Sequence, residues 1–127
     1  MKRVFLAFCI IMVISSLADA KRLHHEKYYQ QKWCQDRSGQ LEVVLPDRTR
    51  CDCLTDSHAI EFDFADKWTA AVGQSLYYSL QTGKRAGIVL ILESLKDRKY
   101  WIRLNTTIQH FNLPIDTWKI GEGVVEK

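Results

Sequence analysis

Residues 87–92 read GIVLIL, and this uninterrupted apolar run restricts the fold more than any other segment. A strand with one solvated face alternates apolar and polar residues, and this run does not. It is therefore predicted to be a strand covered on both faces, at the centre of a sheet. Just before it, residues 66–82 carry an apolar face at helical spacing, and Gly83 is a typical helix stop. That face consists of Trp68, Val72, Leu76 and Leu80.

Further short elements are predicted on either side of this helix and strand. Turn residues separate three β-rich runs, and two more segments have helical periodicity. The predicted helices cover residues 22–35 and 96–111, and the predicted strands cover residues 41–45, 50–54, 58–64 and 115–120. The expected fold is α/β, with the order α-β-β-β-α-β-α-β and a mixed central sheet flanked by helices.

Residues 1–20 have the pattern of a cleavable signal peptide. Two basic residues precede an apolar run, and Ala18-Asp19-Ala20 has the small residues that signal peptidase requires. The apolar run is about half of the ~20 residues that span a bilayer. We therefore expect an exported protein, periplasmic or secreted, that keeps no membrane anchor after cleavage.

Residues 21–127 are then expected to form a single domain. Cleavage would reduce the 18 basic and 15 acidic side chains to 16 and 14. A net charge of +2 excludes a uniformly basic surface, although a local basic patch remains compatible with it. The oligomeric state is left open by the sequence.

Three cysteines remain after cleavage. An oxidising compartment favours one disulfide, and Cys51 and Cys53 point the same way along a strand, which makes a bond between them strained. Cys34 is therefore expected to pair with Cys51 or with Cys53, and the sequence leaves this choice open. A metal site built on these cysteines lacks a fourth ligand at a suitable spacing.

Acidic residues gather on two neighbouring strands. Glu61 and Asp63 are two apart, so both point to one face, and a hairpin turn near Asp56 brings Asp52 close to Glu61. Clustered carboxylates are costly unless they are protonated or bridged by a cation, and hard oxygen ligands suit Mg²⁺ or Mn²⁺. The alternative is that all three acids are solvated on an exposed sheet face.

A polar stripe on the following helix lies beside these acids. Lys67, Gln74 and Tyr78 are seven and eleven residues apart and fall on one side of a helix. An ordinary solvated helix face would have the same pattern.

Taken together, these residues resemble those of a known nuclease family. Asp52 on one strand, Glu61-Phe62-Asp63 on the next, and Gln74-Ser75-Leu76-Tyr77-Tyr78 on the following helix are similar to the motifs of the PD-(D/E)xK (restriction-endonuclease-like) superfamily, in its RecB-like branch. Residues 51–92 also resemble small exported bacterial proteins of unassigned role.

The resemblance implies a restriction-endonuclease-like core and a function in nucleic-acid hydrolysis. It implies that Mg²⁺ or Mn²⁺ is held by Glu26, Asp52, Glu61 and Asp63. It also implies that catalysis is carried by Asp52, Glu61, Asp63, Lys67, Gln74 and Tyr78. Phosphate contacts are expected from Arg50, Lys84, Arg85 and Arg98.

One residue departs from the pattern of the family. The lysine expected on the third strand is Asp63 here, and Lys67 at the start of the next helix is its candidate replacement. The expected function is thus an exported, metal-dependent nuclease-like protein that hydrolyses phosphodiester bonds. The alternative is a catalytically inactive binding module on the same fold, and a third possibility is a structural domain whose acids are simply solvated.

Overall fold

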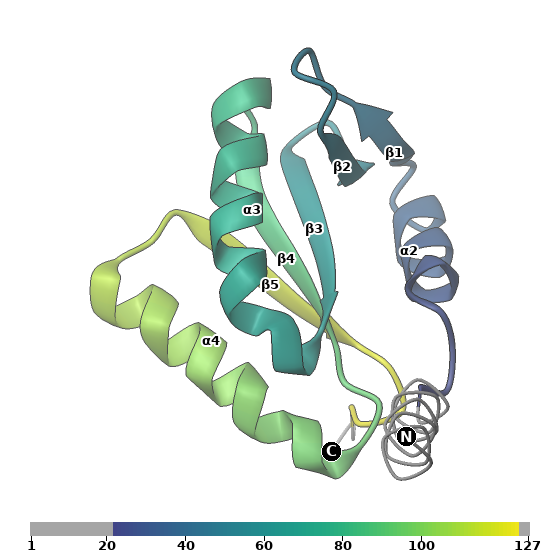
Figure 1. Ribbon diagram of the computed structural model, residues 1–127, viewed down its shortest axis with the longest axis vertical. Coiled ribbons are helices and arrows are strands. Elements are labelled where there is room, and N and C mark those ends of the chain that lie inside the picture. Colours follow the sequence, from purple (N-terminus) through teal and green to yellow (C-terminus); the bar gives the residue numbers. More distant parts are fainter. Residues whose placement is uncertain (1–21, 125–127) are drawn as a thin grey trace, which may run out of the picture.

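The computed structural model describes residues 22–124 and contains one mixed sheet with the strand order β1-β2-β3-β4-β5 (Figure 1). The predicted signal peptide at residues 1–20 lies outside the described residues. Among the described helices, none is both long and apolar enough to cross a membrane.

Residues 22–124 form the α-β-β-β-α-β-α-β order along the chain that the sequence predicts. Two 3-10 turns, η1 and η2, are added in front of the second and third helices. The elements are α2 (Glu26–Gln35), β1 (Gln40–Val44), β2 (Arg50–Leu54), β3 (His58–Phe64), η1 (Ala65–Lys67), α3 (Trp68–Thr82), β4 (Arg85–Ile91), η2 (Leu95–Asp97), α4 (Arg98–Phe111) and β5 (Ile115–Ile120).

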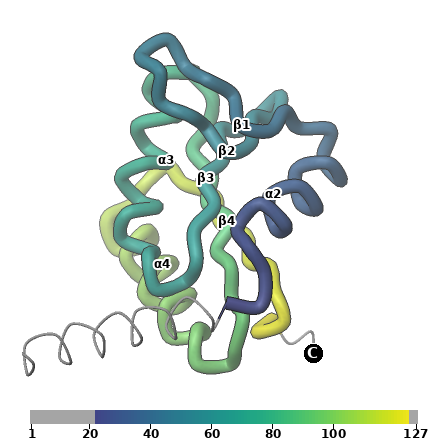
Figure 2. The backbone as a smooth tube through the Cα atoms, turned by 45° about the vertical axis from the view of Figure 1, so that its right-hand side comes forward, coloured from purple at the N-terminus to yellow at the C-terminus, as the bar shows by residue number. Residues whose placement is uncertain are grey.

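Helices cover both faces of the sheet. β1, β2 and β3 are antiparallel neighbours, whereas β3, β4 and β5 are parallel and are joined by α3 and α4. Ile88 of β4 shares a core cluster with Ala71 of α3 and Leu104 of α4. The next residue, Val89, belongs to a cluster with Trp33 of α2. The sheet therefore lies between α2 on one side and α3 and α4 on the other (Figure 2).

The apolar strand is buried as predicted, but its predicted position at the centre of the sheet is wrong. Residues 86–91 of β4 are all buried, yet β4 lies between β3 and β5, and β3 is the middle strand. An apolar run reports that both faces are covered, and this is true of any inner strand. It carries no information about how many strands lie beyond it.

The predicted inward face of α3 is confirmed at Trp68, Val72 and Leu76, which pack against the core, and is wrong at Leu80. Leu80 is 79% exposed, whereas Ala71, Ser75 and Tyr78 are the buried residues of this helix. Small side chains at Ala71 and Ser75 allow close approach of the helix to the sheet. The predicted stop is confirmed, because Gly83 caps the helix in the left-handed conformation at φ 69°.

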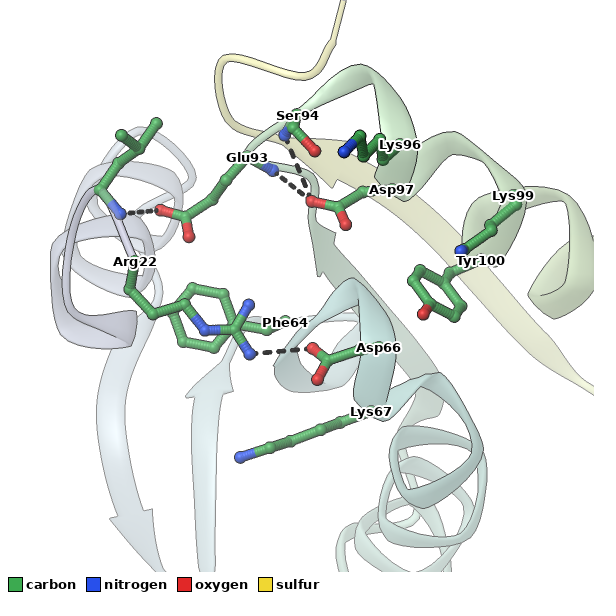
Figure 3. Close-up of a pocket in the computed structure, with 11 residues that line it drawn as sticks. Arg22, Phe64, Asp66, Lys67, Glu93, Ser94, Lys96, Asp97, Lys99 and Tyr100 are labelled. Atoms are coloured by element: carbon green, nitrogen blue, oxygen red, sulfur yellow. Dashed lines mark hydrogen bonds and ion pairs between the residues drawn. The ribbon is translucent and has the colours of Figure 1, made fainter. Parts of the chain in front are cut away.

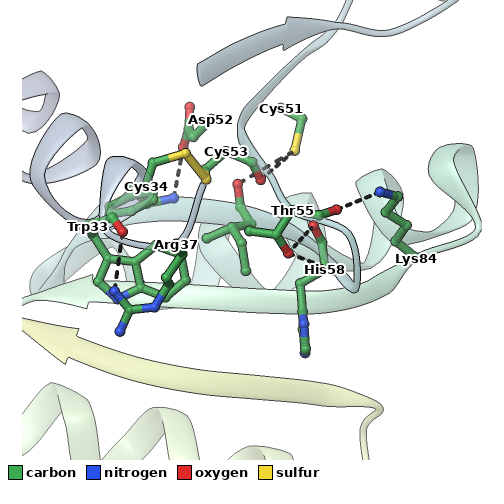
Figure 4. Close-up of a disulfide and its surroundings, with 11 residues drawn as sticks. Trp33, Cys34, Arg37, Cys51, Asp52, Cys53, Thr55, His58 and Lys84 are labelled. Atoms are coloured by element: carbon green, nitrogen blue, oxygen red, sulfur yellow. Dashed lines mark hydrogen bonds between the residues drawn. A yellow bond between two sulfur atoms is a disulfide. The ribbon is translucent and has the colours of Figure 1, made fainter. Parts of the chain in front are cut away.

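The structure decides which cysteine pairs with Cys34. Cys34 of α2 and Cys53 of β2 form the disulfide, with their Cα atoms 6.0 Å apart, and Cys51 remains a buried free thiol (Figure 4). A Cβ atom at Gly39 would lie 2.6 Å from both bridged sulfurs, so only glycine fits at this position. The disulfide thus fixes α2 to β2.

Replacing Cys34 and Cys53 together by serine is expected to lower the free energy of unfolding by about 3 kcal/mol, because the bond closes a loop of 19 residues. Urea denaturation of the oxidised protein measures this difference. Cys51→Ala is the matched control, and a smaller loss is expected because no cross-link is removed. An equal loss in both variants would contradict a stabilising Cys34–Cys53 bond.

Candidate active site

The candidate site begins where β2 leaves β3. These strands pair at only two positions, whereas β3 and β4 pair at seven. Beyond the Cys53 and Ile60 pair, the backbone N–H of Phe62 donates to Asp52 Oδ2 at 2.7 Å. The Asp52 carboxylate thus replaces a carbonyl group of β2 as the partner of this N–H group. Beyond this point the two strands separate, and further side chains fit between them.

Three predicted acids meet at this opening. Glu61 and Asp63 lie on the same face of β3, as the sequence predicts. The carboxyl group of Glu61 is within hydrogen-bond reach of the carboxyl groups of Asp52 and Asp63. Glu61 is only 5% exposed. The alternative of three solvated acids therefore fails at Glu61, whereas Asp52 and Asp63 are half-buried.

Glu26 joins the same cluster from the other layer of the molecule. It lies in the first turn of α2, and its carboxyl group is close enough to Asp52 and Asp63 for their charges to raise its pKa. Four carboxyl groups from α2, β2 and β3 thus share one site. We refer to Glu26, Asp52, Glu61 and Asp63 as the acidic cluster.

Burial and mutual repulsion make the acidic cluster hold protons. Burial, followed by repulsion from Asp52 and Asp63, raises the pKa of Glu61 to about 11. Burial and the neighbouring acids also raise the pKa of Glu26 to about 7 and that of Asp63 to about 6, and burial raises the pKa of Asp52. Without a cation, the cluster therefore keeps protons at neutral pH.

Two carboxylate oxygens in this cluster are buried and have no donor. These are Oε2 of Glu61 and Oδ2 of Asp63. Ionised carboxylates can only accept hydrogen bonds, so neighbouring acids cannot satisfy one another unless one of them keeps a proton. The two oxygens need a proton or a cation, and hard oxygen donors of this kind suit Mg²⁺ or Mn²⁺. As they stand, however, no three His, Cys, Asp or Glu side chains within residues 22–124 are arranged as a ready metal site.

Lys67 supplies positive charge beside the acidic cluster. It ends η1, directly after β3, and its charge lowers the pKa values of Glu26 and Asp63. Its amino group has no carboxylate within 4.0 Å among the described residues. It is therefore near the acids without being bound to one of them.

The two motif residues on α3 differ in their position. Tyr78 is buried, and the pKa of its hydroxyl group is raised by burial and by the charges of Glu61 and Asp52. Gln74, one turn earlier, is exposed and makes no hydrogen bond within the described part of the chain. The structure thus brings Tyr78 to the acidic cluster and leaves Gln74 at the surface.

Most of the predicted phosphate contacts are engaged elsewhere. Arg85 forms two hydrogen bonds with Asp116, Lys84 donates to the carbonyl oxygen of Thr55, and Arg50 lies 3.6 Å from Glu42. A different basic group, which was not predicted from the sequence, lines a cavity of about 820 Å³ together with Lys67 (Figure 3). This group is Lys96 and Lys99, and their spacing of three residues at the start of a helix was the available signal.

No family model, curated protein or solved structure matches this chain, so the geometry of the site carries the functional argument.

Glu61→Gln is expected to stabilise the metal-free protein at pH 8 by at least about 1 kcal/mol, because one pKa unit corresponds to about 1.4 kcal/mol. The unfolded chain ionises Glu61 near its ordinary pKa, whereas the folded chain holds the proton to about pH 11. The destabilisation that Glu61 causes is therefore absent below about pH 4.5, where the unfolded chain is also protonated, and it grows as the pH rises toward 11.

Thermal unfolding in EDTA from pH 4.5 to 9 measures this effect. The exposed Glu122→Gln is the control and should leave the pH profile unchanged. If Glu61→Gln destabilises the protein equally at all pH values, the carboxyl group is not an unsatisfied charge.

Proposed function

We propose that this protein is an exported, metal-dependent phosphodiesterase that hydrolyses nucleic acid on a restriction-endonuclease-like core. The observation that carries the proposal is the acidic cluster, with two donorless buried oxygens beside Lys67, which pairs with no carboxylate of residues 22–124. Gathering one buried and three half-buried acids destabilises a fold, and a bound divalent cation would offset that cost.

The fold and the disulfide support the proposal. Acids on β2 and β3 and a tyrosine on α3 follow the order of the motifs described above, and all three elements converge on one site. A cross-link between Cys34 and Cys53 fits an oxidising compartment. The periplasm or the exterior of a cell is such a compartment.

Asp52, Glu61 and Asp63 would hold Mg²⁺ or Mn²⁺, with Glu26 completing the set. When bound, a divalent cation lowers the pKa of water and neutralises phosphate charge, which are the two main requirements of phosphodiester hydrolysis. Loss of the protons held by the cluster would accompany binding. The affinity is therefore expected to rise with pH.

The remaining chemistry belongs to side chains at the edge of the cluster. Asp63, whose pKa in the metal-free protein is raised to about 6 by burial and by Asp52, would ligate the metal or orient the attacking water. Lys67 carries the positive charge that would stabilise the additional negative charge on phosphorus in the transition state. The buried hydroxyl group of Tyr78 would orient a water or a phosphate oxygen.

A catalytically silent binding module is the second candidate. Two observations favour it: Asp63 replaces the expected strand lysine, and the acids within residues 22–124 do not form a ready metal site. Such a module would bind a ligand at the same opening without turnover.

Mn²⁺ is expected to bind at one site with release of protons, and its affinity should fall by about tenfold or more between pH 8 and pH 6. Isothermal titration calorimetry in two buffers of different ionisation enthalpy measures both quantities. Glu61→Gln should abolish binding, and Glu122→Gln should not. Equal affinity in the two variants would place the metal elsewhere.

Cleavage of single-stranded and duplex DNA, and of RNA, by the purified protein tests the activity. With Mg²⁺ or Mn²⁺ we expect cleavage that Glu61→Gln abolishes, and a loss of about 10²-fold to 10³-fold in Lys67→Ala. Lys67→Ala should still bind Mn²⁺, which separates its role from folding and from metal binding. Lys119→Ala, an exposed lysine on β5, is the matched control.

The combined results separate the two candidates. Metal binding without cleavage of any substrate would reject the phosphodiesterase and support the binding module. Absence of both metal binding and cleavage would reject the metal site itself.

A further inference from the structure

The cavity of about 820 Å³ lies between the start of α2, the end of β3 and the start of α4 (Figure 3). Its charged lining consists of Arg22, Asp66, Lys67, Glu93, Lys96, Asp97 and Lys99. These are four cations and three acids, so the formal excess is one positive charge. What the cavity can bind depends more on which of these side chains already form hydrogen bonds or ion pairs within the protein.

The three acids of the cavity are occupied by donors of the protein itself. Glu93 accepts from the backbone N–H groups of Leu23 and His24 and from the hydroxyl group of Tyr29, at 2.8 to 3.2 Å. Asp97 accepts from two backbone N–H groups at the start of η2, at 2.9 and 3.2 Å. Each carboxylate anchors a wall of the cavity through one oxygen, Oε2 of Glu93 and Oδ2 of Asp97.

The remaining acid is neutralised by the arginine. Arg22 pairs with Asp66 at 2.9 Å, and its guanidinium group lies 3.8 Å from the centre of the Phe64 ring. Arg22 and Asp66 therefore form part of the wall. The three lysines are the cations of the cavity that form no ion pair with a carboxylate of residues 22–124.

Lys67, Lys96 and Lys99 have no carboxylate within 4.0 Å among residues 22–124. Lys99 lies over the ring of Tyr100, with 5.0 Å between its amino group and the ring centre. All three lysines line the cavity, and Figure 3 shows Lys96 and Lys99 at the start of α4 and Lys67 extending beneath Arg22. Three unpaired cations in one cavity indicate an anionic ligand.

Lys96 and Lys99 lie at the positive end of a helix dipole. They flank the N-terminus of α4, a helix of 14 residues, with its N-cap residue Asp97 between them. The positive end of a helix dipole repels cations and attracts anions. The Asp97 carboxylate offsets part of this repulsion, and a bound phosphate would offset more of it.

The cavity is continuous with the acidic cluster. Lys67 and Arg22 line the cavity, and their charges also act on Glu26. Phe64 lines the cavity and directly follows Asp63 on β3. A chain of phosphates that places one phosphate at the acidic cluster can therefore extend toward Lys96 and Lys99.

We infer that this cavity is the binding site for the single strand next to the scissile phosphate, with Lys96 and Lys99 contacting its backbone. This inference rests on the proposed function. The volume falls within the ~300–1,000 Å³ of sites that enclose small ligands, which suits one or two nucleotides and not a duplex. The contacts are to phosphates, so DNA and RNA strands are both expected to bind.

Fluorescence anisotropy with labelled 12-nucleotide DNA and RNA strands tests the inference. The full protein carrying Glu61→Gln prevents cleavage during the measurement. Adding Lys96→Ala and Lys99→Ala is expected to weaken binding at least tenfold. It should also reduce the slope of log affinity against log salt by about 1.4, because each phosphate that a lysine neutralises on a single strand contributes about 0.7.

Lys32→Ala with Lys119→Ala is the matched control. It removes the same charge from two exposed lysines that do not line the cavity, and the affinity should change less than twofold. Equal weakening by both pairs would show that only the total charge matters and would overturn the inference. Failure of the parent to bind either strand, or tighter binding of a duplex, would also overturn it.

Thermal unfolding provides an independent readout. Because the two cations repel the helix dipole, Lys96→Ala with Lys99→Ala should leave the melting temperature unchanged or raise it. A lowered melting temperature together with weakened binding would mean that the lysines serve the fold, which would overturn the inference.

Failure of this inference is distinguishable from failure of the proposed function. If the double variant Lys96→Ala with Lys99→Ala cleaves nucleic acid with an unchanged KM, the proposed nuclease function stands and the strand-binding site is rejected. Binding that depends on these lysines, in a protein that cuts nothing, would keep the strand site and reject the phosphodiesterase.

Discussion

The candidate site depends on one hydrogen bond, from the backbone N–H of Phe62 to Asp52 Oδ2. In a continuous antiparallel ladder that N–H would donate to a carbonyl group of β2. The carboxylate takes its place, satisfies the buried donor and allows β2 to leave β3. Glu61 and Asp63 can then occupy the opening without exposing unpaired main-chain groups.

The disulfide fixes the position of this separation. Cys53 is at the last paired position before Asp52, and its bond to Cys34 attaches that point of β2 to α2. The same helix carries Glu26 in its first turn. The cross-link therefore holds together the two layers that contribute acids.

The acidic cluster lies at this opening, and the lysines line the cavity next to it. The acidic cluster holds protons because burial disfavours its ionised form, whereas the lysines of the neighbouring cavity have no acid partners among the described residues. Lys67 belongs to both surroundings, because it lines the cavity and its charge lowers the pKa of Asp63. A cation bound at one end and a phosphate bound at the other would complement each other.

The sequence by itself determined the order of the elements, the shared face of Glu61 and Asp63, and the need for a disulfide that includes Cys34. These properties depend on spacings of two to four residues, which local backbone geometry translates into faces. Only the tertiary structure decided that Cys53 is the bridged partner, that β3 is the middle strand, and that Leu80 and Gln74 face solvent. It also decided that Lys96 and Lys99 share a cavity with Lys67. Those outcomes depend on strand register and on the packing of distant helices, for which a single sequence has no local signal.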